Sequence, residues 1–212
     1  FVDISHLQQE QNRGLPNAIL FGICLSPNYI QEVMDTPDYV QARIETNFGF
    51  DDDELYLKEL KADELSDILA DSLIKQGYKA YSQSDANQIA TNSFDGVYEK
   101  TLLPHKTIAL LTGIGWIGKH NLLVTSQYGS AICLGTVLTD APLATVSHPP
   151  TLPRCGACNI CQEVCDPKVL KGCIWNTSIQ REDIIDVYRC TTCMKCLVSC
   201  PWTQAYVKRA NK

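Results

Sequence analysis

Three features are missing from this 212-residue sequence, and each absence excludes a class of protein. No apolar run approaches the roughly 20 residues that cross a bilayer, and the short run Ala18–Leu25 lacks the basic flank and the cleavage site of a signal peptide. The 24 Asp and Glu residues outnumber the 18 Lys and Arg residues, and only the tail with Lys208, Arg209 and Lys212 is basic. We therefore expect a cytoplasmic protein without membrane contact and without a basic surface for nucleic acid.

Cysteine, in contrast, is plentiful, with 11 residues in the chain. Most of them form the pattern C-x2-C-x2-C-x3-C, which is written twice. This spacing is typical of two-cluster ferredoxins, in which the fourth cysteine of each run binds the other cluster. The spacing therefore predicts two [4Fe-4S] clusters with crossed ligands, one held by Cys155, Cys158, Cys161 and Cys200, and the other held by Cys165, Cys190, Cys193 and Cys196.

Two other uses of cysteine fit this pattern less well. Structural zinc favours two separated C-x2-C pairs and does not need a third cysteine at the same interval. A disulfide framework is poorly served by an odd number of cysteines in closely spaced runs. Of the remaining three, Cys24 and Cys133 lie in apolar runs and are expected in the core, and Cys173 is excluded as a cluster ligand.

A proline-rich linker divides the sequence. The segment Ser147–Pro153 contains three prolines in seven residues. It separates a predicted α/β cofactor or substrate domain, residues 1–148, from a predicted ferredoxin-like domain with two [4Fe-4S] clusters, residues 149–212. Because the second segment is rich in loops, the first is expected to supply the main hydrophobic core. The sequence begins at Phe1 and leaves open whether the native N-terminus lies upstream.

The pattern of apolar residues predicts both helices and strands in the first segment. Residues 18–25 are expected to form a strand covered on both faces, and residues 78–81 a second strand. Residues 52–76 predict a helix with an acidic first turn and a stop at Gly77. Its expected buried stripe consists of Leu57, Leu60, Leu65, Ile68, Leu69 and Leu73. Residues 121–125 and 131–139 predict a hairpin, so the fold class is α+β, a mixed α/β sandwich.

Residues 113–120 read Gly-Ile-Gly-Trp-Ile-Gly-Lys-His, which satisfies G-x-G-x-x-G. The dinucleotide-binding motif follows a strand and opens a helix, whereas here a predicted helix over 104–111 precedes the glycines and a strand follows them. The phosphate-loop pattern fails because His120 stands where Ser or Thr must hold magnesium. Close backbone approach at the glycines beside Trp116 and Lys119 suits the lining of a planar cofactor. The alternative is a glycine turn with Trp116 in the core.

Three stretches together resemble a known family: Leu103–Ala109, Thr112–Thr125 and Thr136–Leu143, followed by Cys-Gly-x-Cys and a closing Cys-Pro-Trp at 200–202. Over about residues 102–203 the sequence resembles the epoxyqueuosine reductase family, particularly its short relatives, which share their plan with reductive dehalogenases. Members of the family reduce an epoxide in a modified tRNA nucleoside to an alkene. They use two [4Fe-4S] clusters that deliver electrons to a cobalamin.

The resemblance implies a nitroreductase-like, cobalamin-binding sandwich in front of the ferredoxin-like module, and it assigns the cluster ligands to the same eight cysteines. It also implies that the segment Gly113–Lys119 lies near the corrin. The cofactor-binding residues expected from it are His105, Lys106, Gly113, Gly115, Trp116, Gly118 and Lys119.

The sequence departs from the family in two ways. It lacks the D-T-G-P-V-L-E-R stretch that contains the family's proton-donating aspartate. His105 takes the place of the glutamate in that stretch, and counting back from it identifies Glu99 as the candidate catalytic carboxyl group, with a solvated surface glutamate as the alternative. The sequence also lacks the family's helical-repeat extension and a basic face, so a tRNA substrate is in doubt.

These observations predict an iron-sulfur oxidoreductase that relays electrons through two [4Fe-4S] clusters to a corrinoid or substrate site, with cobalamin as the expected further cofactor. The expected partners are a redox donor such as a ferredoxin or flavodoxin and a small-molecule or nucleoside substrate. The main alternative is a ferredoxin-like electron-transfer protein that docks on a redox partner and has no substrate of its own. A second alternative is that the clusters are purely structural.

Overall fold

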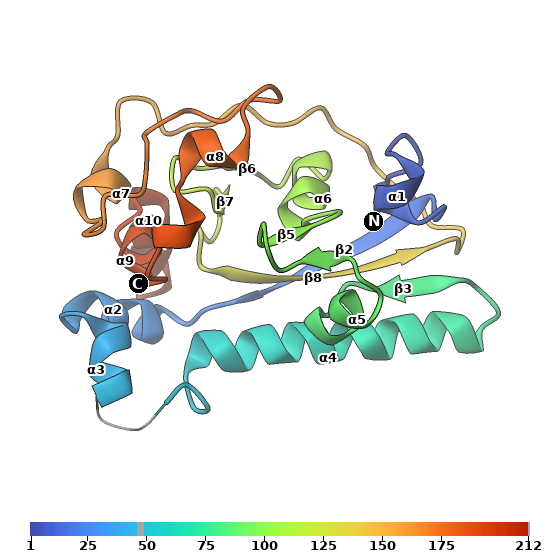
Figure 1. Ribbon diagram of the computed structural model, residues 1–212, viewed down its shortest axis with the longest axis horizontal. Helices are drawn as coiled ribbons and strands as arrows, with labels where there is room; N and C mark the ends of the chain where they lie inside the picture. The colour runs from blue at the N-terminus through green and yellow to red at the C-terminus, as the bar shows by residue number, and fades with distance from the viewer. Residues whose placement is uncertain (46–48, 212) are drawn as a thin grey trace. The chain divides into compact units, whose positions relative to one another are not determined.

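The computed structural model describes residues 1–45 and 49–211 of a mixed α/β protein (Figure 1). The chain forms two compact units, each assembled from three segments. The first unit contains residues 1–23, 58–113 and 133–149, and the second contains residues 24–57, 114–132 and 150–212. One change of unit falls beside the predicted domain boundary at residue 148. Residues 24–57 and 114–132 nevertheless group with the cysteine-rich segment, so the division into 1–148 and 149–212 stays a prediction.

The elements that lie wholly or mostly in the first unit are β1 (Val2–Asp3), α1 (Gln9–Asn12), β2 (Asn17–Cys24), α4 (Glu54–Lys75), β3 (Ala80–Ser82), α5 (Asp85–Ala90), β4 (Phe94–Asp95), β5 (Lys100–Thr101), α6 (His105–Leu111) and β8 (Ile132–Thr139). Those of the second unit are α2 (Pro27–Asp35), α3 (Tyr39–Glu45), β6 (Gly115–Ile117), β7 (Leu123–Thr125), α7 (Ile160–Glu163), α8 (Arg181–Ile184), the 3-10 helix η1 (Val187–Arg189), α9 (Lys195–Val198) and α10 (Pro201–Ala210).

A four-stranded sheet with the order β1-β2-β8-β3 forms the centre of the first unit. Its long strands β2 and β8 run side by side in Figure 1. Ala18 and Leu138 belong to one hydrophobic cluster, whereas their chain neighbours Ile19 and Val137 belong to another. Successive side chains of a strand point to opposite faces, so both faces of the sheet are covered. The predicted strand at 18–25 and the mixed α/β class are confirmed.

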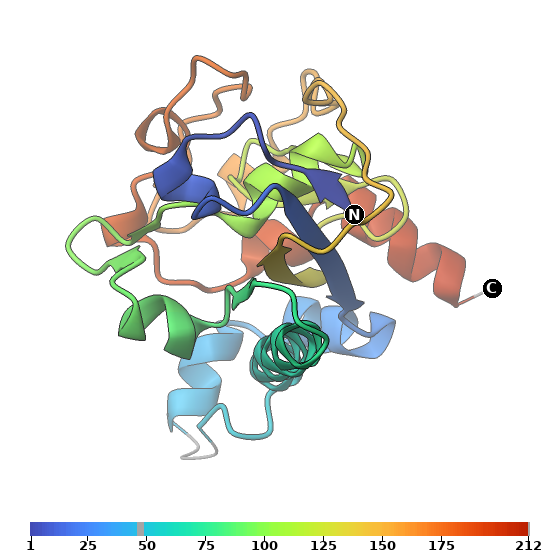
Figure 2. The same cartoon turned by 90° about the vertical axis from the view of Figure 1, so that its right-hand side faces the viewer.

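Helix α4 is seen nearly along its axis in Figure 2. It ends before Gly77, whose φ of 91° suits glycine, so the predicted helix is confirmed. The predicted buried stripe is largely wrong, because Leu57, Leu60 and Ile68 are 47%, 47% and 55% exposed. The buried face carries the smaller side chains Ala62, Ser66 and Ala70 together with Leu73. Small side chains let a helix lie close to a sheet, and this packing, rather than hydrophobicity alone, decides the buried face.

The predicted hairpin between residues 121–125 and 131–139 is also wrong. Both segments contain strands, but β7 pairs with β6, while β8 joins the four-stranded sheet. The physical reason lies in the turn, where Thr125 and Gly129 exchange two backbone hydrogen bonds of 2.8 and 3.0 Å. This antiparallel bridge is not extended, because the next backbone N–H groups donate elsewhere, that of Ser130 to the Thr203 hydroxyl and that of Ala131 to the carbonyl oxygen of Tyr128.

The second unit consists of short helices and loops around the cysteines. α2 packs against α9 and α10, and α7 packs against α9. Cys161 and Cys165 contribute to a small hydrophobic cluster with Val169, Leu170 and Ile185. Within residues 1–45 and 49–211, no helix is both long enough and apolar enough to cross a membrane.

Candidate metal centre

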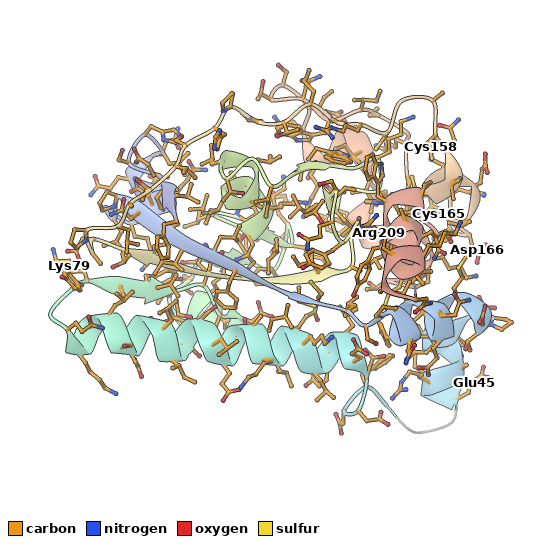
Figure 3. The ribbon with its side chains drawn as sticks, turned by 180° about the vertical axis from the view of Figure 1, so that it is seen from behind. Glu45, Lys79, Cys158, Cys165, Asp166 and Arg209 are labelled. Carbon is orange, nitrogen blue, oxygen red and sulfur yellow. The ribbon has the colours of Figure 1, made fainter. Side chains whose placement is uncertain are left out.

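All eight cysteines of the two runs lie in the second unit. Cys161 lies on α7, Cys196 lies on α9, and Cys200 caps the N-terminus of α10. The other five lie in the loops that flank these short helices: Cys155, Cys158, Cys165, Cys190 and Cys193. Figure 3 labels Cys158 and Cys165 on the segments on either side of α7. Helices of four residues separated by tight turns bring thiols that are distant in sequence into one region.

The cysteines predicted for one cluster line a single hollow. Cys155, Cys158, Cys161 and Cys200, here called the first site, surround a space of about 440 Å³ that is partly open to solvent. The other residues that line it are Lys119, His120, Arg154, Pro201 and Trp202. The structure thus brings the closing cysteine of the second run to the first three cysteines of the first run, an arrangement that suits crossed ligands.

The thiols of the first site influence one another. Burial, followed by the neighbouring thiols of Cys155, Cys158 and Cys200, raises the pKa of Cys161 to about 11. Burial also raises the pKa of Cys200, and the backbone N–H groups of Trp202 and Thr203 partly oppose this rise. Thiolates are the form that binds metal, so the raised pKa values mean that metal binding at this site must release protons.

The remaining four cysteines, here called the second site, are Cys165, Cys190, Cys193 and Cys196. Burial, followed by the thiols of Cys193 and Cys190, raises the pKa of Cys196 to about 12, and Cys161 and Cys165 add to the effect. Cys190 is exposed, in contrast to the buried Cys165. The second site therefore reaches the protein surface at Cys190.

Among the residues that the structure describes, no three Cys, His, Asp or Glu side chains come close enough together to hold one ion. A zinc ion needs its sulfur ligands at about 2.3 Å, whereas each thiolate around a [4Fe-4S] cluster binds a different iron. The preference for a cluster over zinc rests on the spacing of the cysteines in the sequence and stays a prediction.

Lys119 and Trp116, predicted to contact a corrin, lie beside the first site. Lys119 is only 7% exposed, and its Nζ donates to the carbonyl oxygens of Gly156 at 2.9 Å and Cys158 at 3.0 Å. Trp116 is 2% exposed, and its ring packs edge-on against Trp202 at 4.9 Å. Its indole N–H has no acceptor among the described residues. Corrin contact by these two residues stays a prediction.

The glycines of the same segment allow close packing. A Cβ at Gly115 would lie 2.3 Å from the carbonyl oxygen of Val124, and one at Gly118 would lie 2.7 Å from the His120 ring. Gly115 lies on β6, and Gly118 directly follows it. Within the second unit, these glycines therefore serve the pairing of β6 with β7, and their corrin contact is untested.

The other predicted residues belong to the first unit. His105 opens α6, and its Nδ1 lies 2.8 Å from the hydroxyl oxygen of the fully buried Thr136. Burial lowers the pKa of His105 to about 4, so this imidazole is neutral. Lys106 is half-buried on α6, and Gly113 follows the helix with a φ of 72°. Glu99 is exposed in the turn between β4 and β5, with a φ of 48°, and its catalytic role stays a prediction.

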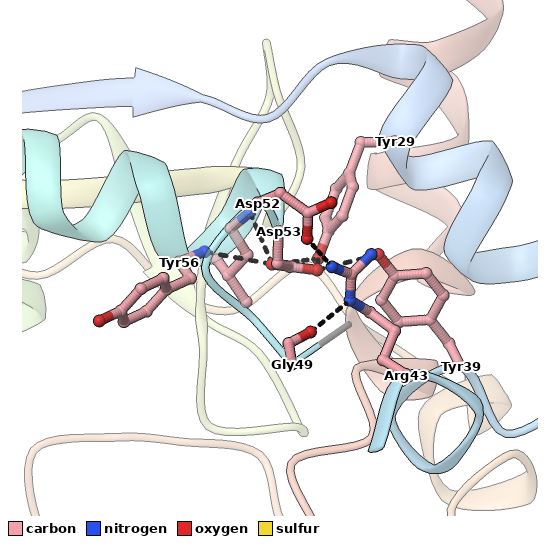
Figure 4. Close-up of polar contacts among 8 residues, drawn as sticks. Tyr29, Tyr39, Arg43, Gly49, Asp52, Asp53 and Tyr56 are labelled. Atoms are coloured by element: carbon pink, nitrogen blue, oxygen red, sulfur yellow. Dashed lines mark hydrogen bonds and ion pairs between the residues drawn. The ribbon is translucent and has the colours of Figure 1, made fainter. Parts of the chain in front are cut away.

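The sequence analysis missed a buried carboxylate that is linked by hydrogen bonds to the loop of the second site. The Asp53 carboxylate is 3% exposed and accepts hydrogen bonds from the hydroxyl groups of Tyr29 and Tyr39 (Figure 4). Burial and the nearby Asp53 charge raise the pKa of Tyr29. The Tyr29 hydroxyl also lies 3.4 Å from Sδ of Met194, in the loop that contains Cys193. Nothing in the local sequence pattern links Asp53 to residue 194, so only the fold reveals this contact.

The chain is similar in sequence to curated epoxyqueuosine reductases, although no family model matches it. It is 30% identical over 125 residues to the protein from Atelocyanobacterium thalassa, a match that covers 51% of this chain and 40% of the relative. It is 32% identical over 117 residues to the protein from Listeria monocytogenes, covering 47% of this chain and 29% of the relative. The match thus takes in less than half the length of either relative. These matches confirm the predicted resemblance.

Solved structures share the fold. A catabolic reductive dehalogenase superposes with a TM-score of 0.62 at 17% identity, over 89% of this chain and 26% of its own. A selenomethionine-labelled epoxyqueuosine reductase superposes with a TM-score of 0.50 at 16% identity, over 95% of this chain and 52% of its own. At these identities the likeness concerns the mixed α/β fold alone.

Proposed function

We propose that this chain, a relative of the epoxyqueuosine reductases, is an iron-sulfur oxidoreductase that passes single electrons to a corrinoid and a substrate bound beside it. The premise is the sequence similarity to those reductases. The observation that carries the proposal is the hollow of the first site, lined by Cys155, Cys158, Cys161 and Cys200. Three of these thiols come from one cysteine run and the fourth from the other, as the crossed ligation of two [4Fe-4S] clusters requires.

The residues of the second unit are suited to hold two clusters. The first site would bind one cluster, and Cys165, Cys190, Cys193 and Cys196 would bind the other. When bound, such clusters accept and release one electron each. The protein surrounds the first site with the apolar surface of Trp202 and with the buried side chains of Lys119 and His120. These groups limit the access of water and fix the loop geometry on which ligation depends.

The corrinoid part of the proposal is supported by the family resemblance and by groups in the first unit. His105 is held by Thr136 and is neutral, so it can form hydrogen bonds to a bound group without bringing a charge into an apolar site. We propose Glu99 as the proton donor because of its position in the sequence relative to His105. Its exposure means that a bound substrate would have to cover it before it could serve as a general acid.

The substrate class follows from the name of the relatives. Epoxyqueuosine is a modified tRNA nucleoside, so the proposed substrate carries an epoxide or a similarly reducible group on a nucleoside. The net charge of −6 does not favour long contacts with a tRNA backbone. We therefore propose a nucleoside-sized or small-molecule substrate, with a ferredoxin or flavodoxin as the electron donor. Reduction of an epoxide in intact tRNA would contradict the proposed small substrate.

Anaerobic purification and reconstitution test the proposal. We expect about eight irons and eight acid-labile sulfides per chain, as two [4Fe-4S] clusters require. Added cobalamin should bind with one-to-one stoichiometry and change its visible spectrum. Zinc in place of iron would overturn the cluster assignment. If the chain binds eight irons but no cobalamin, the reductase hypothesis is wrong and the protein is a ferredoxin-like electron carrier.

A further inference from the structure

Lys119 is a buried cation to which the described residues offer no acidic partner. Its side chain is 7% exposed, and within the described part of the chain no carboxylate forms an ion pair with it. Its three N–H donors are used by the carbonyl oxygens of Gly156 and Cys158 and, at 3.3 Å, by Oδ1 of Asn159. Buried charges are normally paired, because leaving water is costly for an isolated charge. A negative charge beside Lys119 would offset this cost, and none of the carboxylates in the described residues supplies it.

The location of Lys119 indicates where that negative charge lies. Lys119 lines the hollow of the first site together with four cysteines. Arg154 lines the same hollow, with its guanidinium carbon 5.4 Å from the centre of the Trp116 ring. Four thiolates around a [4Fe-4S] core carry a net negative charge in every common oxidation state. Two cations beside such a group would balance it, and the hydrogen bonds of Lys119 would hold the loop that carries Cys155 and Cys158.

The second site has a different electrostatic environment. Lys195, which directly precedes Cys196 in the chain, pairs with two carboxylates, Asp38 at 2.9 Å and Asp166 at 2.5 Å. The buried carboxylate of Asp53 reaches the same loop through Tyr29, whose hydroxyl contacts Met194. Lys195 is therefore neutralised, and Arg189, which precedes Cys190, is exposed, so that water and salt screen its charge. Lys119 is buried, and no carboxylate of the described residues forms an ion pair with it. Net charge and hydrogen bonding around a cluster set its reduction potential.

We propose that Lys119 is a positioning residue of the first site, and that its uncompensated charge makes this site the easier of the two to reduce. The inference rests on the proposed function, because it requires both clusters. Reduction adds one electron from a ferredoxin-like or flavodoxin-like donor, so the negative charge of the site grows by one while no bond forms or breaks. A nearby ammonium in a poorly hydrated site favours the more negative state. Electrons that enter at the second site, where Cys190 is exposed, would pass to the first.

The test compares redox titrations, followed by electron paramagnetic resonance, of the reconstituted wild type with three variants. Lys119→Met removes the charge at similar length, and Lys119→Arg keeps it. Lys168→Met is the matched control, because Lys168 also donates to loop carbonyls, those of Gln162 and Glu163, but is exposed. Water and salt screen an exposed charge, so Lys168→Met should leave both midpoint potentials unchanged.

With K119M we expect both clusters to be present and the higher of the two midpoint potentials to become more negative. The expected shift is at least tenfold in the reduction equilibrium, about 59 mV for one electron, and a shift of the lower potential alone would overturn the inference. K119R should stay close to the wild type. Unchanged potentials in K119M, or an equal shift in K168M, would overturn the inference and leave the proposed function intact. If K119M loses one cluster and K119R keeps both clusters, the result supports the inference. If K119R loses that cluster as well, the inference is overturned. A wild type without clusters would refute the proposed function itself.

Discussion

At the scale of one residue, Asp53 stabilises the start of α4. Its Oδ1 accepts from the backbone N–H groups of Leu55 at 2.9 Å and Tyr56 at 3.2 Å. This is helix capping, and it lies at the acidic helix start that the sequence predicted. The same carboxylate also binds two tyrosine hydroxyls, so one side chain joins the helix start to α2 and α3.

Replacement of Asp53 by Ala should lower the free energy of unfolding by about 3 kcal/mol, because buried donors lose a charged acceptor and the helix loses its cap. Asp53→Asn should have a smaller effect, since an amide oxygen can still cap. The control is Asp52→Ala, which removes a mostly exposed carboxylate paired with Arg43 and should change the free energy by less than about 0.5 kcal/mol. Urea denaturation of the reconstituted protein measures all three. Equal effects of the two Ala substitutions would contradict the role of Asp53.

His105 gives a pH dependence whose sign follows from its burial. The pKa of His105 falls from 6.5 to about 4 on folding. Because the unfolded chain binds the proton more readily, protonation favours unfolding, and stability that is complete near pH 7 is lost as the pH falls through 6.5 toward 4. Between pH 7 and pH 5 the wild type should lose about 2 kcal/mol more than His105→Gln. Denaturant titrations at both pH values measure the difference. Parallel pH curves would show that His105 is not buried in its neutral form.

At the scale of elements, a glycine lets the turn after β7 lie against α10. Gly129 has a φ of 60°, and a Cβ there would lie 2.2 Å from the backbone nitrogen of Thr203. The next residue, Ser130, donates its N–H to the Thr203 hydroxyl at 3.0 Å. Since Cys200 is the N-cap residue of α10, this contact also fixes a predicted cluster ligand of the first site.

Gly129→Ala should therefore lower the free energy of unfolding by about 3 kcal/mol, from backbone strain together with the collision. It should also reduce the iron content, because α10 must move away with Cys200. Gly14→Ala is the control, since Gly14 has a φ of 73° but a Cβ there would meet no neighbouring atom within 4 Å. That variant should lose only about 1 kcal/mol. Thermal melting and iron analysis of both proteins provide the comparison, and equal losses would contradict the role of the close contact.

At the scale of the whole molecule, pairs of cysteine substitutions distinguish crossed from separate ligation. If the ligands are crossed, Cys155→Ser with Cys200→Ser damages one cluster and leaves about four irons per chain. Cys190→Ser with Cys200→Ser damages both clusters and leaves almost none. If each run held its own cluster, the two results would be exchanged. Iron analysis after anaerobic reconstitution reads out the difference, with the wild type as the reference for full loading.

Features of this protein can be predicted from the sequence when they depend on residues that lie close together in the chain. The cysteine spacing predicts which thiols share a cluster, because short loops and four-residue helices leave them little freedom. The limits of α4 are likewise local, set by Asp53 at one end and Gly77 at the other. The face that α4 buries is not local, since Ile19 and Val137 of the sheet select Ala70 and Leu73 over the larger Ile68.

The sequence by itself determined the two cysteine runs, the helix and strand types and the family resemblance, because these depend on residues close together in the chain. Only the tertiary structure decided that Lys119 serves the loop of Cys158 and that β7 pairs with β6. It also decided that Asp53 reaches Met194 through Tyr29. The physical reason is that buried charges and close backbone contacts are satisfied by whichever partners the packed chain brings near, and no local pattern encodes those partners.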